Sequence, residues 1–239
     1  MDDSDLFASA SRLSNPRRPL LGLTVLVVED SRYACEAMRL LCLRSGARIR
    51  RADCLKSANR HLQVYRPSAV VIDLGLPDGS GLDLIRELSQ CTPRVSVILG
   101  MSGDDNAEAA AIEAGADGFL PKPVTSLGAF QTAILSKLPP DRQPVGLRQV
   151  SDEEIIPDRL AYRDDMAHAA EVLNDDESDK SWDYLAQFLG GVARSVGDAP
   201  LADAAAALAA SRKEGRSIAS ETAQIAGLVQ ERLQERVAI

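Results

Sequence analysis

Five short runs rich in β-branched residues alternate with helical segments between residues 23 and 138, and this alternation constrains the fold most. Strands joined by intervening helices form right-handed crossovers, which make the strands parallel and cover both faces of the sheet. The sequence therefore predicts an α/β domain with a doubly wound, five-stranded parallel sheet. We expect strands at 24–29, 47–52, 69–73, 94–99 and 117–121, and helices at 31–46, 54–66, 81–90, 105–115 and 126–138.

The chain changes character after this block. Residues 139–157 contain four prolines and no hydrophobic period, which indicates a linker. Alanine then dominates without strand signals, so we expect an all-α domain built as an antiparallel four-helix bundle. Its helices are expected near 158–173, 179–196, 199–213 and 216–237. The predicted organisation is a flexible N-terminal tail at 1–20, an α/β domain at 21–139, a linker at 140–157 and a helical domain at 158–239.

The charge and composition of the chain limit the classes of molecule that it is expected to bind. The formal net charge is −8, and the excess of acidic residues lies mainly after residue 140. Phosphate contacts need clustered Lys and Arg, so nucleic acid is an unlikely partner. The chain has no apolar run near the roughly 18 residues of a membrane span, no signal-peptide pattern and no paired-cysteine motif. We therefore expect a cytoplasmic protein with reduced thiols and no membrane partner.

Polar side chains follow the ends of four of the five predicted strands. These residues are Glu29, Asp30, Asp73, Ser102 and Lys122. Because the carboxyl ends of parallel strands meet at one edge of a sheet, we expect these groups to converge. Clustered carboxylates raise one another's pKa unless a cation lies among them, and Mg²⁺ prefers such oxygen ligands. Asp73 would then act as a nucleophile toward a phosphoryl group, with Ser102 and Lys122 stabilising its oxygens.

Each of these residues also has an ordinary explanation when taken alone. Asp73 could form a turn, Glu29 and Asp30 could cap a helix, and Lys122 could be a surface lysine. The whole set, in order and at suitable spacing, favours a functional site.

The stretches "VLVVEDS", "VVIDLGLPDGSGLDLI", "MSG" and "GADGFLPKPV" closely resemble the receiver domain of bacterial response regulators. The resemblance covers residues 23–138 and implies the flavodoxin-like version of the predicted sheet. It implies that Asp73 accepts phosphate from a phosphohistidine of a sensor histidine kinase or phosphotransfer protein. It also implies that Glu29, Asp30 and Asp73, together with the Gly75 carbonyl, bind Mg²⁺.

The same resemblance assigns a conformational role to two further positions. Ser102 would be the switch hydroxyl and Phe119 the switch aromatic, although Phe119 could equally be a fixed core residue. Gly103 departs from the family pattern, in which alanine is more common at this position. That difference removes no reactive group from the site.

Residues 186–210 resemble the central part of a histidine-phosphotransfer domain, with Gly191 and the following apolar period in place. The position of the reactive histidine is Gln187, and an amide cannot accept a phosphoryl group. Gly190 stands where that family usually has lysine. The resemblance therefore implies a degenerate domain that retains a protein-docking surface at Gln187, Phe188, Gly190 and Gly191.

Two alternatives for the second half stay open. His168 could carry phosphate, but Glu171 lies three residues on and no glycine clears space beside it for a docking receiver. The helical domain could also be a plain spacer or dimerisation bundle, because alanine fits any helix.

These observations predict a response regulator of a two-component phosphorelay, phosphorylated on Asp73, with a protein-binding output. Its expected partners are a kinase, a phosphotransfer protein or another response regulator, and a homodimer stays open. The alternative is a transcriptional regulator whose helical domain binds nucleic acid in an unfamiliar way. No enzyme activity is expected beyond the receiver's own phosphorylation and dephosphorylation.

Overall fold

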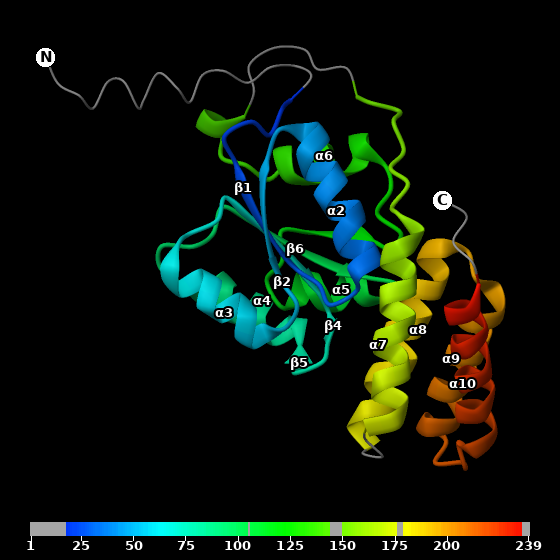
Figure 1. Ribbon diagram of the computed structural model, residues 1–239. Coiled ribbons are helices and arrows are strands. Elements are labelled where there is room, and N and C mark those ends of the chain that lie inside the picture. Colours follow the sequence, from blue (N-terminus) through cyan, green and yellow to red (C-terminus); the bar gives the residue numbers. More distant parts are fainter. Residues whose placement is uncertain (1–17, 105, 144–149, 176–178, 236–239) are drawn as a thin grey trace, which may run out of the picture.

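The computed structural model describes residues 18–104, 106–143, 150–175 and 179–235. An α/β domain lies beside a helical domain in this part of the chain (Figure 1). The predicted tail as far as residue 17, and residues 144–149 of the predicted linker, lie outside the described residues. No helix within the described ranges is long and apolar enough to cross a membrane.

The α/β domain contains a five-stranded parallel sheet, as the sequence predicts. Its strand order is β2-β1-β3-β6-β7. A separate two-stranded hairpin, β4-β5, was not predicted. The strands are β1 Thr24–Val28, β2 Arg48–Ala52, β3 Ala69–Asp73, β4 Gly75–Leu76, β5 Gly79–Ser80, β6 Val97–Ser102 and β7 Gly118–Pro121. The helices are α2 Arg32–Ser45, α3 Leu55–Val64, α4 Gly81–Gln90, α5 Ala107–Glu113, α6 Leu127–Leu135 and the 3₁₀ turn Pro140–Arg142.

The central strands are apolar on both sides because helices cover both faces of the sheet. In β1, Val25 and Val27 join the core beneath α2 and α6, whereas Leu26 and Val28 join the core beneath α3, α4 and α5. All four side chains are fully buried. Burying a Val or Leu side chain contributes about 1.5–3 kcal/mol, so these strands anchor the edge from which the polar residues project.

Local signals set the helix ends. The hydroxyls of Ser31, Ser80 and Ser126 accept hydrogen bonds from backbone N–H groups in the first turns of α2, α4 and α6. Gly46 ends α2 at φ 83°, a left-handed conformation that glycine adopts without a Cβ clash. The sequence predicted this glycine as a C-cap.

The structure corrects two of the predicted domain boundaries, because residues assigned to the tail and to the linker pack in the core of the α/β domain. Leu20 was assigned to the flexible tail, but it is fully buried in the core beneath α2 and α6. Ile155 was assigned to the linker, but it is buried in the same core, and its N–H donates to the Thr125 carbonyl. Residues 150–157 therefore pack against the α/β domain before the helical domain begins.

The helical domain contains α7 Arg159–Asp175, α8 Asp179–Val196, α9 Ala199–Lys213 and α10 Ala219–Gln234. These helices follow the predicted ones closely, although α10 begins three residues later than expected. Their apolar faces share one core, in which Met166, Leu185, Leu189, Leu208 and Ile225 are fully buried.

A polar cluster holds this domain together at the start of α9. Asp198 caps α9 by accepting from the Leu201 N–H at 3.2 Å. The same carboxylate accepts from the Tyr162 hydroxyl of α7 at 2.8 Å and from Arg232 of α10 at 2.8 and 3.1 Å. The side chains of Arg232 and Asp198 are only 13% and 10% exposed, so solvent screens this ion pair weakly.

Asp198→Ala should therefore lower the free energy of unfolding by about 2–3 kcal/mol, because it removes a cap and leaves Arg232 without this partner. Urea denaturation followed by circular dichroism measures the change. Asp203→Ala is the matched control, because Asp203 is exposed on the same helix and its loss should cost no more than about 0.5 kcal/mol. Equal losses in the two variants would contradict this role of Asp198.

The hydrogen bonds from Arg232 lower the pKa of Asp198 below its ordinary 3.8. A carboxyl group whose pKa is depressed by folding stabilises the protein above its unfolded pKa, and the effect is lost as the pH falls through the folded value. The stability gap between the wild type and Asp198→Asn should therefore shrink once the pH falls below 3.8.

Candidate functional site

The polar residues predicted at the strand ends meet at the carboxyl edge of the sheet. We call this edge the rim and define it by Glu29, Asp30, Asp73, Ser102 and Lys122. Asp73 ends β3 and pairs in register with Met101 of β6. Ser102 ends β6, and its carbonyl accepts from the Lys122 N–H at 2.8 Å. The parallel register thus brings together groups that lie up to 93 residues apart.

Lys122 supplies positive charge at the centre of the rim. Its Nζ lies 2.6 Å from Oε2 of Glu29 and 3.1 Å from Oδ2 of Asp73. All three side chains are at most 9% exposed. A buried charge is tolerated only when it is paired, so Lys122 accounts for the presence of Asp73 at the end of an apolar strand.

Burial is the main reason why the pKa values of the rim carboxyl groups are raised. It raises the pKa of Asp73 and of Glu29 to about 7, against the opposing effect of Lys122. Burial also raises the pKa of Asp30 to about 6, and the nearby Asp73 charge adds to the rise. Burial would lower the pKa of Lys122, but the Asp73 and Glu29 carboxylates outweigh it and raise the value. The mutual repulsion that the sequence predicts also raises these pKa values, but its effect is smaller than that of desolvation.

The carboxylates fit a hard divalent cation. One oxygen from each of Glu29, Asp30 and Asp73 lies within 4.8 Å of the others. Oε2 of Glu29 is buried, and beyond its ion pair with Lys122 it has no hydrogen-bond partner among the described residues. Three clustered carboxylate oxygens of this kind are the ligand set that Mg²⁺ prefers. Gly75, the predicted carbonyl ligand, lies beside them and donates its N–H to the Asp73 carboxylate.

The two predicted switch residues differ in their surroundings. Ser102 is buried at the rim, and its hydroxyl accepts from the Asp104 N–H at 3.1 Å. Phe119 is partly buried and packs against the core beneath α3, α4 and α5. Its role as a switch aromatic stays a prediction.

The helical domain lies directly against the rim. The Tyr184 hydroxyl of α8 donates to Oδ2 of Asp30 at 2.6 Å. Nε2 of His168 lies 3.0 Å from the same hydroxyl. Because Tyr184 gives its one proton to Asp30, His168 must act as the donor in that contact. His168 therefore orients Tyr184, and this contact supplies a structural role for a histidine that was considered as a phosphate carrier.

A second interdomain contact caps α2. The Asp165 carboxylate of α7 accepts from the Ser31 hydroxyl at 2.8 Å and from the N–H groups of Arg32 and Tyr33 at 2.6 and 3.1 Å. Asp165 is 1% exposed, and burial raises its pKa to about 6. A carboxylate at a helix N-terminus is stabilised by the free N–H groups and by the helix dipole.

Sequence analysis missed both Asp165 and Tyr184. Asp165 lies in a run of charged residues and Tyr184 on an amphipathic helix, so both resemble ordinary surface positions. Their partners on the α/β domain lie more than 130 residues away in the chain. No local pattern in the sequence links residues so far apart.

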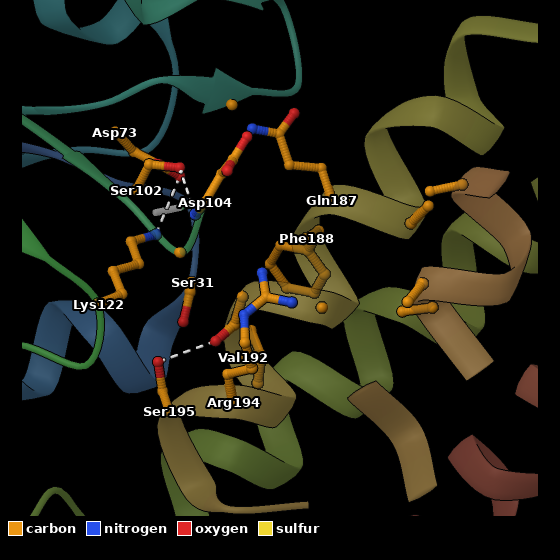
Figure 2. A pocket seen from close by; sticks show the side chains of 18 of the residues that line it. Ser31, Asp73, Ser102, Asp104, Lys122, Gln187, Phe188, Val192, Arg194 and Ser195 are labelled. Carbon is orange, nitrogen blue, oxygen red and sulfur yellow. Dashed lines mark hydrogen bonds and ion pairs between the residues drawn. The ribbon is translucent and has the colours of Figure 1, made fainter. Parts of the chain in front are cut away.

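A cavity of about 870 Å³ lies between the rim and the helical domain (Figure 2). We call it the rim cavity. Its walls include Asp73, Ser102 and Lys122 on one side and the predicted docking residues on the other, namely Gln187, Phe188, Gly190 and Gly191. The Gln187 amide packs directly against Gly75, where a Cβ would overlap it. The predicted docking surface thus faces the chain's own α/β domain.

The comparisons with known proteins concern the α/β domain. Residues 25–134 match the family model of the response regulator receiver domain. The KDP operon transcriptional regulatory protein KdpE of Escherichia coli (strain K12) is 33% identical over 110 residues, which are 46% of this chain and 48% of that protein. The response regulator MprA of Mycobacterium sp. (strain KMS) is 32% identical over 123 residues, which are 50% of this chain and 54% of that protein.

Among solved structures, the response regulator receiver domain (CheY-like) from Methylobacillus flagellatus is 30% identical, with a TM-score of 0.42. The likeness covers 47% of this chain and 98% of that one. The chain spans about half the length of the curated relatives it matches. The strand order and the rim geometry agree with the family match, and residues 25–134 form a response regulator receiver domain.

Proposed function

We propose that this chain is a response regulator of a two-component phosphorelay that accepts a phosphoryl group on Asp73 with the help of Mg²⁺. The observation that carries the proposal is the buried pairing of Asp73 with Lys122 at 3.1 Å, beside the Glu29 and Asp30 carboxylates. Lys122 opposes the effect of burial on the pKa of Asp73, which lies at about 7, so the carboxylate form is available near neutral pH. Only this ionised form is a nucleophile.

The rim residues have distinct tasks in the transfer. An Asp73 carboxylate oxygen attacks phosphorus, forming an acyl phosphate as the P–N bond to the donor histidine breaks and the electron pair leaves with the imidazole. Lys122 neutralises charge that develops on the phosphoryl oxygens, and the Ser102 hydroxyl donates to one of them. Glu29, Asp30 and Asp73 would hold Mg²⁺, and the bound ion would supply further positive charge to those oxygens. The proposed enzyme activity is limited to this self-phosphorylation and to hydrolysis of the acyl phosphate.

The proposed output is protein binding through a four-helix domain of phosphotransfer type. In this proposal Gln187 takes the position of the reactive histidine. The packing of its amide against Gly75, next to the rim, supports a docking role for this surface. Its first partner is the receiver of its own chain. A kinase, a phosphotransfer protein or another response regulator would compete for the same surface.

A second candidate is a transcriptional regulator. KdpE of Escherichia coli and PhoP of Salmonella typhimurium, both similar over part of their length, are named as transcriptional regulatory proteins. The expectation that nucleic acid is an unlikely partner is therefore not supported by the relatives. The acidic second half of the chain still favours protein binding. Salt-dependent retention of the full chain on DNA would favour the transcriptional candidate, because contacts to phosphates release counterions.

Asp73→Asn should abolish labelling by a small phosphodonor such as acetyl phosphate, because the amide is not nucleophilic. In the wild type the label should be labile to hydroxylamine, as an acyl phosphate is, and should disappear when EDTA removes Mg²⁺. Phosphate-affinity electrophoresis measures the labelled fraction. Asp83→Asn is the matched control, since Asp83 is an exposed residue of α4 paired with Arg86. Labelling that persists in Asp73→Asn would refute the assignment of the phosphoacceptor.

Asp30→Asn and Lys122→Ala should separate metal binding from signalling. Asp30→Asn should weaken Mg²⁺ binding by about tenfold or more, because even groups behind a metal ligand contribute that much. Lys122→Ala should leave Mg²⁺ binding largely intact and uncouple phosphorylation from the conformational change. Calorimetric titration with Mg²⁺ and hydrogen exchange after addition of acetyl phosphate measure the two effects, with the exposed Lys137→Ala as control. The opposite pattern would show that the two roles have been exchanged.

A further inference from the structure

Arg194 of α8 reaches across the rim cavity to the loop that follows β6 (Figure 2). Its guanidinium lies against Gly103, where a Cβ would stand 2.9 Å from Nη2 and 3.4 Å from Nε. On its own helix the guanidinium lies against Gly190, where a Cβ would stand 3.3 Å from Nη1 and 3.5 Å from Nη2. The guanidinium occupies the space that a side chain at either glycine would fill. Gly103 and Gly190 are also positions at which the sequence departs from the receiver and phosphotransfer patterns, so both of these departures make room for Arg194.

Arg194 differs from the other arginines near this cavity in its partners. Among the described residues, no hydrogen bond or ion pair involves Arg194. The neighbouring Asp104 accepts instead from the N–H groups of Asn106. By contrast, Arg212 in the wall of the same cavity pairs with Asp183 at 2.9 Å, and Arg232 pairs with Asp198. Within the described part of the chain, Arg194 is therefore an unpaired cation in the wall of the cavity that also contains the buried carboxylates.

The position of Arg194 suits a phosphoryl group on Asp73. Gly103 directly follows Ser102, and the same cavity of about 870 Å³ contains Asp73, Ser102 and Lys122. Lys122 is already shared between Glu29 and Asp73. A phosphoryl group adds a charge of about −1.5 to −2 and three acceptor oxygens, which Lys122 alone does not satisfy. A planar guanidinium offers five donors in the fork geometry that matches phosphate oxygens.

We propose that Arg194 binds the phosphoryl group on Asp73, so that the helical domain reads the phosphorylation state of its own receiver. This inference rests on the proposed phosphorylation of Asp73. Phosphorylation then tightens the contact between the two domains, because the new anion and the guanidinium come from opposite sides of it. In the phosphorylated protein, the surface around Gln187 and Phe188 is therefore covered by the receiver and cannot bind other proteins. In the unphosphorylated protein, other proteins reach this surface more readily.

The test uses the full chain with Mg²⁺ and beryllofluoride, a stable mimic of the aspartyl phosphoryl group. Arg194→Gln should weaken beryllofluoride binding by about tenfold or more, as expected for the loss of a charge-assisted hydrogen bond. Titration followed by ¹⁹F NMR measures the affinity. Arg212→Gln is the matched control, because Arg212 lines the same cavity but pairs with Asp183, and its loss should leave the affinity within about twofold.

Gly103→Ala provides an independent variant, because its methyl group should displace the guanidinium and weaken beryllofluoride binding in the same direction. A second readout is hydrogen exchange of the α8 amides, which beryllofluoride should slow in the wild type but not in Arg194→Gln. Equal affinities of the wild type and Arg194→Gln would overturn the role of Arg194 and leave the phosphoacceptor assignment intact. The role of Arg194 would also be overturned if Arg194→Gln bound beryllofluoride more weakly but beryllofluoride slowed exchange of the α8 amides equally in both proteins. No binding by the wild type would overturn the proposed phosphorylation of Asp73 and this inference with it.

Discussion

Three carboxylates are buried at one edge of the receiver sheet, and the surrounding structure balances their charge. Glu29, Asp30 and Asp73 lose most of their hydration, which raises the pKa of each group. Lys122 pairs with two of them. The hydrophobic strands hold the groups at this edge against their desolvation cost. This arrangement of paired and clustered charges supports the proposed binding of a divalent cation and the proposed transfer of a phosphoryl group to Asp73.

The helical domain supplies further hydrogen-bond partners to polar groups of the receiver. Tyr184 satisfies one oxygen of Asp30, and Asp165 satisfies the free N–H groups at the start of α2. Two receiver glycines next to the rim, Gly75 and Gly103, let side chains of α8 approach the receiver backbone closely. The contact between the two domains thus depends on hydrogen bonds and close packing.

The receiver could be predicted from the sequence because its signals are local. Alternating apolar runs identify the strands, and parallel pairing carries Asp73, Ser102 and Lys122 to one edge whatever the loops do. The hairpin β4-β5 was missed because its strands contain two residues each. The interdomain residues, such as Asp165, could not be predicted, since their partners depend on how the two domains pack. A polar side chain on a helix usually faces solvent, and nothing nearby in the sequence marks the exception.

The claim that the helical domain rests on the receiver rim can be measured directly. In the full chain, the amides of Arg32 and Tyr33 donate to Asp165 of the other domain, although the first turn of a helix offers them no acceptor of its own. Hydrogen exchange of these two amides should therefore be slow in the wild type and fast in Asp165→Ala, while the amides of the receiver core stay unchanged. Fast exchange of both amides in the wild type would contradict the docked arrangement.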